Sequence, residues 1–236
     1  MQQLPDGSLA TLAALDAAAD RTVRAGLLLP WANVAVETEL ARLGLRHTVF
    51  HHARLVPPSR TTAVDASFWR GLREASAQAL DSLSHISLNT VVLACTSAGF
   101  TEGPPLPSGV LTAFDALRQA LAGAAVRRIV LVTPYPDLVT AAEAVALSEA
   151  GVEVLAFASL GLDDGYADVT PDRILGLVQR LPEEAVASAD AMVLSCTGWH
   201  TLPVVGELER RFRKPVFSSN LAIALLAARA CAGVAS

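Results

Sequence analysis

Two short apolar runs constrain the fold of this 236-residue chain more than any other feature. The first, Thr90–Gly99, is TVVLACTSAG, and the second, Ala191–Trp199, is AMVLSCTGW. Each has the aliphatic composition of a strand buried on both faces of a parallel sheet, and each reaches a cysteine followed by threonine. Because the carboxyl ends of such strands lie at the edge where open α/β sheets bind ligands, we expect Cys95 and Cys196 to face one cleft.

The two cysteine-bearing runs belong to a longer internal repeat. Cys95 and Cys196 lie about one hundred residues apart, as do Pro30 and Pro134, each of which closes an earlier apolar run. Strand–helix–strand–helix–strand order recurs between these landmarks and predicts two α/β lobes related by a pseudo-two-fold axis, each with a short parallel sheet. The predicted organisation is an N-terminal arm or helix over residues 1–22, a first lobe over 23–123 and 215–236, and a second lobe over 124–214.

Composition and charge exclude several classes of partner. Apolar residues make up 52% of the chain, the net charge is −5, and there is no basic run, so nucleic acid is not an expected partner. No uncharged apolar segment reaches the ~18 residues of a membrane span, and the first residues lack the cationic start of a signal peptide. Three cysteines do not suggest a disulfide framework. We therefore expect a cytoplasmic protein that binds neither nucleic acid nor membrane.

Local signals predict further features. The Gly- and Pro-rich segment 99–109 predicts a long loop, either a lid over the cleft or an ordinary connection. Ser108 is expected to cap the helix that follows, and Thr201 the helix over 202–212. Histidines 47, 51 and 52 do not converge on one face of their strand, so no metal site is expected.

Five segments together resemble a known family, the aspartate/glutamate racemase superfamily, and within it the branch of maleate cis-trans isomerases and arylmalonate decarboxylases. The resemblance implies two Rossmann-like lobes, no cofactor, a homodimer, and a cleft with up to two cysteines. The segments are GLLLPWANVAVETE (26–39), VVLACTSAGF (91–100), VRRIVLVTPYPDLV (126–139), VLSCTGWHTLPVVGELERRF (193–212) and PVFSSN (215–220).

The cysteines carry the chemistry that the resemblance implies. The decarboxylases of this branch have glycine at the first cysteine position, so Cys95 indicates a two-cysteine isomerase or racemase. By resemblance, Cys95 is the nucleophile and Cys196 the proton donor. Racemisation needs one thiolate to remove a proton and one thiol to return it, whereas cis-trans isomerisation needs a thiolate that adds to a double bond. A free thiol has a pKa of about 8.5, so we expect the site to lower the pKa of one cysteine.

Either reaction places negative charge on the substrate carboxylate, and hydrogen-bond donors must stabilise it. By resemblance, Asn33 and Tyr135 bind the carboxylate, although Asn33 also has the position of a helix cap. Residues 218–220 have a similar alternative as the cap of the last helix. The full set of predicted substrate-binding residues is Asn33, Thr96, Ser97, Tyr135, Thr197, Gly198, Ser219 and Asn220.

Several residues near the predicted cleft differ from those of the maleate isomerases and bear on the choice of substrate. Trp31 and Ala32 replace small polar residues of the maleate isomerases, and Asp163-Asp164-Gly165 stands where those enzymes tend to carry asparagine. These differences favour a monocarboxylate or a substrate with an apolar arm. The alternatives are a decarboxylase of the arylmalonate kind and a non-catalytic protein that binds a small acid, with Trp31 filling part of the pocket.

Overall fold

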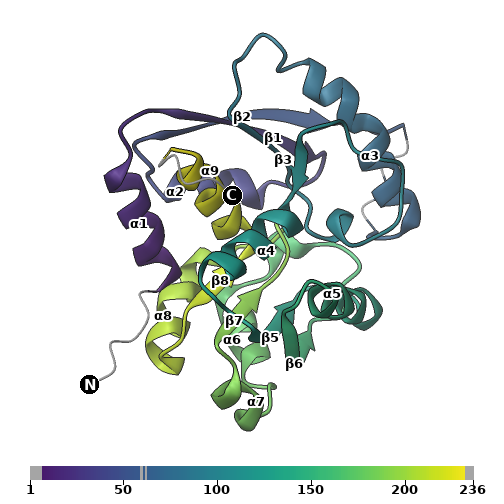
Figure 1. Ribbon diagram of the computed structural model, residues 1–236. Helices are drawn as coiled ribbons and strands as arrows, with labels where there is room; N and C mark the ends of the chain where they lie inside the picture. Colours follow the sequence, from purple (N-terminus) through teal and green to yellow (C-terminus); the bar gives the residue numbers. More distant parts are fainter. Residues whose placement is uncertain (1–6, 59–60, 62, 232–236) are drawn as a thin grey trace.

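Two parallel four-stranded sheets form the framework of the computed structural model, which describes residues 7–58, 61 and 63–231 (Figure 1). The first sheet has the order β2-β1-β3-β4 and the second the order β6-β5-β7-β8. The same order thus occurs twice along the chain, which confirms the predicted fold of two α/β lobes. The strands are β1 (Val23–Pro30), β2 (Thr48–Leu55), β3 (Thr90–Leu93), β4 (Val110–Thr112), β5 (Arg128–Thr133), β6 (Glu153–Ser159), β7 (Ala191–Leu194) and β8 (Val216–Ser218).

Helices connect the strands. A first helix, α1, covers Ser8–Ala18, within the part of the chain predicted as an arm or helix. None of the helices in the described residues is long and apolar enough to cross a membrane. The other α-helices are α2 (Ala35–Arg42), α3 (Ala66–Asp81), α4 (Ala113–Gly123), α5 (Asp137–Glu149), α6 (Pro171–Val178), α7 (Glu183–Ser188), α8 (Leu202–Phe212) and α9 (Ser219–Cys231).

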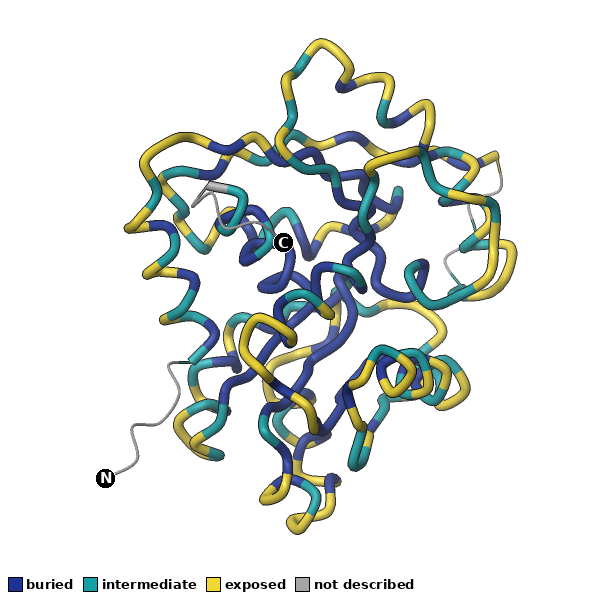
Figure 2. Tube along the Cα trace, in the orientation of Figure 1, coloured by how far each residue is buried: buried dark blue, intermediate teal, exposed yellow. Residues whose placement is uncertain are grey.

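The central strands are buried because their sequences are apolar on both faces. In β1 only Arg24 is exposed, and all four residues of β7 are buried. Figure 2 shows these buried stretches running through both sheets, with exposed residues on the outer helices and turns. Removing aliphatic side chains from water on both faces is the main favourable contribution to such a sheet. This burial holds the carboxyl ends of β3 and β7, beyond which the cysteines lie.

The structure divides the C-terminal segment between the two lobes, whereas the prediction assigned all of residues 215–236 to the first lobe. Residues 216–218 were expected in the first lobe, but β8 pairs with β7, with Val216 beside Met192. Only α9 returns to the first lobe, where it packs against α1, α4 and β1 (Figure 1). Val216 and Phe217 are buried in the second sheet, and this burial decides the placement of the strand.

Of the two predicted helix caps, Ser108 is wrong, and Thr201 occupies the N-cap position of α8 without a side-chain hydrogen bond to the helix. The helix expected to start after Ser108 is preceded by the three-residue strand β4, and α4 is capped by Thr112, whose hydroxyl accepts a hydrogen bond from the amide of Asp115 at 3.1 Å. Thr201 does not cap α8 with its own side chain. Instead the buried Glu39 of α2 accepts from the amide of Leu202 at 2.6 Å. The start of α4 is thus set by a local capping box, whereas the start of α8 depends on a contact with a distant segment.

The loop 99–109 is fastened to α3 and contributes no residue to the wall of the cavity between the two lobes. The guanidinium of Arg73 donates to the carbonyls of Ala98, Thr101 and Pro104. These contacts favour the ordinary connection over the lid.

Candidate active site

A cavity of about 260 Å³ lies where the carboxyl ends of the two sheets meet. Residues after β1, β3, β5 and β7 contribute to its wall, together with α3 and the segment after β6. The lining residues are Pro30, Ala32, Asn33, Val64, Phe68, Cys95, Thr96, Ser97, Tyr135, Asp164, Gly165, Tyr166, Ala167, Cys196, Thr197 and Gly198.

The two thiols lie in the wall of this one cavity. Cys95 follows β3 and Cys196 follows β7, at equivalent places in the two sheets, and both are free and buried. Cys196 has a φ of 138°, a conformation that residues with a side chain rarely adopt. Such strain persists only where surrounding contacts hold the backbone, and it is concentrated at functional sites. The backbone at Cys196 is therefore held by its neighbours.

Burial, rather than hydrogen bonding, controls the ionisation of both cysteines. Burial raises the pKa of Cys196 to about 12, against the opposing effect of hydrogen bonds from Tyr135 and from the amide of Gly198, which lies 3.2 Å from Sγ. Burial also raises the pKa of Cys95. The expectation that the site lowers the pKa of one thiol is thus wrong for this structure, because the loss of hydration outweighs the donors.

Ser97 connects Cys95 to α3. Its hydroxyl lies 3.5 Å from the thiol of Cys95 and accepts a hydrogen bond from the indole nitrogen of Trp69 at 2.9 Å. Because Ser97 accepts from the indole, its own proton is free to point toward the sulfur or a ligand. Sequence reasoning missed Trp69, since nothing local connects a helical tryptophan with a strand end 28 residues later.

Asn33 caps a helix, as one of its predicted alternatives required, and it also lines the cavity. Its side-chain oxygen accepts from the amides of Ala35 and Val36 at the start of α2, at 3.1 and 3.3 Å. Its amide nitrogen donates to the hydroxyl of Thr197 at 2.9 Å and so joins the two lobes at the cavity. One N–H of Asn33 is left for a ligand.

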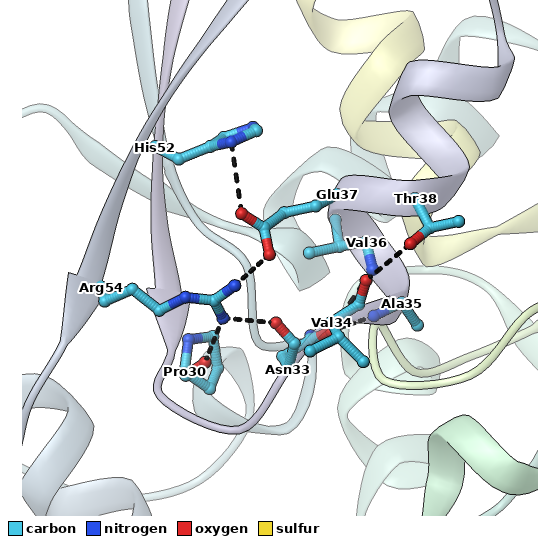
Figure 3. A network of polar contacts seen from close by, with 9 residues as sticks. All are labelled: Pro30, Asn33, Val34, Ala35, Val36, Glu37, Thr38, His52 and Arg54. Carbon is cyan, nitrogen blue, oxygen red and sulfur yellow. Dashed lines mark hydrogen bonds and ion pairs between the residues drawn. The ribbon is translucent and has the colours of Figure 1, made fainter.

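An ion-paired arginine braces the loop that carries Asn33 (Figure 3). Arg54 of β2 donates to the carbonyl of Asn33 at 2.5 Å and to that of Pro30 at 3.4 Å, and it pairs with Glu37 of α2. His52 lies against the other oxygen of Glu37 at 3.4 Å. The brace fixes the backbone between β1 and α2 from outside the cavity.

Ser219 and Asn220 do not line the cavity, contrary to their prediction as substrate-binding residues. The hydroxyl of Ser219 accepts from the amide of Cys196 at 3.0 Å and from the hydroxyl of Thr96 at 2.9 Å. The amide of Asn220 donates to the carbonyl of Thr197 at 3.3 Å. Both residues lie behind the cysteine loops and support them.

Residues 218–220 had the alternative role of capping the last helix, and Ser218 has this role. Its hydroxyl accepts a hydrogen bond from the amide of Leu221 at 3.1 Å, at the start of α9.

Two tyrosines pack together at the cavity. The rings of Tyr135 and Tyr166 meet edge to face, with centroids 5.7 Å apart. Burial raises the pKa of both phenols, so they are hydrogen-bond donors at neutral pH. A β-carbon added at Gly198 would approach Tyr166 to 3.2 Å and the sulfur of Cys196 to 3.4 Å, so a larger residue here would require Tyr166 to shift by a few tenths of an ångström. Tyr166 was not predicted from the sequence.

Trp31 lies outside the cavity wall, so the feature that would have favoured the binding-protein alternative is absent.

Comparison with known proteins finds a matching family model and related sequences. Residues 97–234 match the family model described as arylmalonate decarboxylase. The maleate isomerase of Pseudomonas putida is 28% identical over 224 residues, which cover 84% of this chain and 88% of that protein.

Two solved structures have a similar fold. A Nocardia farcinica maleate cis-trans isomerase mutant with a covalently bound succinylcysteine intermediate superposes with a TM-score of 0.78 at 22% identity, over 89% of this chain and 92% of that one. A liganded double mutant of arylmalonate decarboxylase superposes with a TM-score of 0.73 at 26% identity, over 91% of this chain and 95% of that one. The chain belongs to the arylmalonate decarboxylase family, in the branch of the aspartate/glutamate racemase superfamily that also contains the maleate isomerases.

Proposed function

We propose that this protein is a cofactor-independent isomerase or racemase that resembles the maleate isomerases and uses two of its own cysteines to act on a small carboxylic acid. The observation that carries this proposal is the pair of thiols, Cys95 and Cys196, in the wall of one cavity. A covalently bound succinylcysteine in a structural relative supports cysteine as the nucleophile.

Three of the predicted binding residues can offer a donor to the substrate carboxylate. Asn33 has one unused N–H. The hydroxyl of Ser97 can turn its proton from the Cys95 thiol to a ligand, and the phenol of Tyr135 can exchange its hydrogen bond to Cys196 for one to a ligand. The hydroxyls of Thr96 and Thr197 are already donated, to Ser219 and to the carbonyl of Ala94. We therefore assign carboxylate binding to Asn33, Ser97 and Tyr135, and a supporting role to the two threonines.

The proposed isomerisation uses Cys95 as a thiolate. Its sulfur adds to one carbon of the double bond, and the electron pair of that bond moves to the carboxylate, which becomes an enediolate stabilised by the donors. Rotation about the new single bond and expulsion of the thiolate give the other isomer. The thiol of Cys196 can protonate the neighbouring carbon of the enediolate, which gives a saturated adduct on Cys95. The resulting Cys196 thiolate removes that proton again before the Cys95 thiolate is expelled. In a racemisation the same two thiols remove and return the α-proton from opposite faces.

The wall of the cavity favours one carboxylate over two. Among the described residues that line it, Asp164 is the one charged side chain, and it is acidic. Val64, Phe68 and Ala32 add apolar surface, and no arginine, lysine or histidine is present among these lining residues to neutralise a second carboxylate. We propose that the substrate is a monocarboxylate with an apolar arm.

Proton NMR in D₂O tests the proposed function. The protein would be incubated with maleate, aspartate, glutamate, hydantoins, α-aryl malonates and α-aryl propionates, beside Cys95→Ala and Cys196→Ala. We expect α-proton exchange or isomerisation of an acid with an apolar arm, and loss of at least about a hundredfold in rate in either variant.

The other outcomes separate the alternatives. Carbon dioxide release that survives Cys95→Ala would indicate a decarboxylase. A rise in melting temperature with an acid but no turnover would indicate a binding protein. We also propose, from the resemblance, a homodimer in the cytoplasm, which sedimentation and fractionation would measure.

A further inference from the structure

Glu143 is a carboxyl group buried near the cysteines. It lies on α5, is fully buried, and accepts one hydrogen bond, from the hydroxyl of Ser195. Its second oxygen, Oε2, is buried without a partner in the described structure. A buried carboxylate with one neutral donor is costly, so the uncharged acid is favoured, and burial raises the pKa of Glu143 to about 8.

A chain of hydroxyls leads from this carboxyl to the strained cysteine. Ser195 directly precedes Cys196, and its hydroxyl lies 3.5 Å from that of Ser219. Ser219 accepts from the amide of Cys196 at 3.0 Å and from Thr96 of the first lobe at 2.9 Å. The backbone at Cys196, with its φ of 138°, is thus held by hydrogen bonds that end at Glu143.

The charge of Glu143 would also matter to the thiols. The titratable groups that interact with it in the described structure are Cys196, on the loop after β7, and Tyr135, on the loop after β5. A negative charge at Glu143 raises the pKa of both groups. The neutral acid leaves a Cys196 thiolate without this repulsion.

We propose that Glu143 is a positioning residue for Cys196 that works as the uncharged acid, holding the Ser195–Cys196 backbone without placing a negative charge beside the thiol. The inference rests on the proposed function only in the role given to Cys196.

Alkylation tests this inference without any substrate. The rate of Cys196 modification by iodoacetamide would be followed by peptide mass spectrometry from pH 6.5 to 10, in a Cys95→Ser background. Glu143→Gln keeps the shape and the acceptor but cannot ionise, and Glu143→Leu removes the acceptor. Glu149→Gln, an exposed carboxyl on the same helix, is the matched control. Circular dichroism confirms that each variant is folded.

Two comparisons decide the outcome. Below pH 7.5 we expect the rate of Cys196 alkylation in Glu143→Gln to lie within about twofold of the rate in the parent. The rate in Glu143→Leu should differ from that of the parent by about fivefold or more, because this variant loses one buried hydrogen bond. Above pH 8.5 Cys196 should be alkylated several-fold more slowly in the parent than in Glu143→Gln, because the ionised carboxylate of Glu143 then repels the thiolate. The Glu149→Gln control should be alkylated at the rate of the parent. Coincident pH profiles for the parent and Glu143→Gln, or equal rates for the Gln and Leu variants at pH 7, would overturn the proposal. Neither result depends on turnover, so a failed isomerase assay leaves this test intact.

Discussion

At the scale of single residues, the environment of Cys95 depends on a donor that lies far away in sequence. The indole of Trp69 holds Ser97, and Ser97 lowers the pKa of Cys95 against the effect of burial. A hydroxyl that is held in place donates more effectively to a thiolate than one that rotates freely.

We therefore expect Trp69→Phe to slow the alkylation of Cys95 by iodoacetamide by about three- to tenfold at pH 8, in a Cys196→Ser background. Phenylalanine keeps the apolar contact but has no N–H. Ser97→Ala should slow the reaction at least as much, and the double variant should show no further loss. Additive losses would mean that Trp69 acts on Cys95 by another route.

At the scale of elements, the loop between β1 and α2 brings Asn33 to the cavity and is braced by Arg54 from β2 (Figure 3). We expect Arg54→Gln to raise KM for the acid that turns over by about fivefold with kcat within twofold, because a looser loop weakens binding more than chemistry. Arg24→Gln, an exposed arginine on the adjacent strand, is the control and should match the wild type. A fall in kcat at unchanged KM would contradict this role.

The start of α4 is a second test at this scale. Thr112 and Asp115 form a capping box, whereas Ser108 is exposed and does not cap the helix. Thr112→Ala should lower the free energy of unfolding by about 1 kcal/mol in urea titrations, and Ser108→Ala by less than about 0.5 kcal/mol. The reverse order would restore Ser108 as the cap.

At the scale of the whole molecule, the buried Glu143 makes stability depend on pH. Its pKa rises from an ordinary 4.5 to about 8 in the folded chain. Between these values the folded protein keeps a proton that the unfolded chain releases, so stability falls as pH rises from about 4.5 to 8 and then levels off. At about 1.4 kcal/mol per pKa unit the loss is up to about 5 kcal/mol.

Glu143→Gln removes this titration. We expect the variant and the wild type to have similar free energies of unfolding near pH 4.5, and the variant to be more stable by an increasing margin up to pH 8. Denaturant titrations at four pH values measure the difference, with Glu149→Gln as control. A margin that stays constant from pH 5 to pH 8 would show that Glu143 does not titrate in this range.

Much of this molecule was predictable from its sequence. The buried β-runs, the repeat and the placement of Cys95 and Cys196 in one cavity all come from local apolar pattern, since a buried parallel strand carries the residues at its carboxyl end to the ligand-binding edge of the sheet. Asn33 and Tyr135 were assigned by the family resemblance instead, and both line the cavity just beyond a strand end.

The tertiary structure alone decided the rest. Trp69, Arg54 and Glu143 act on the site across long sequence separations, and no local pattern records which distant groups will share a hydrogen bond. The same reason explains the misplaced residues: Ser219 and Asn220 directly follow a strand end, yet packing of α9 places them behind the wall. Sequence determines which groups reach the sheet edges, whereas burial determines which of them face the cavity and with what charge.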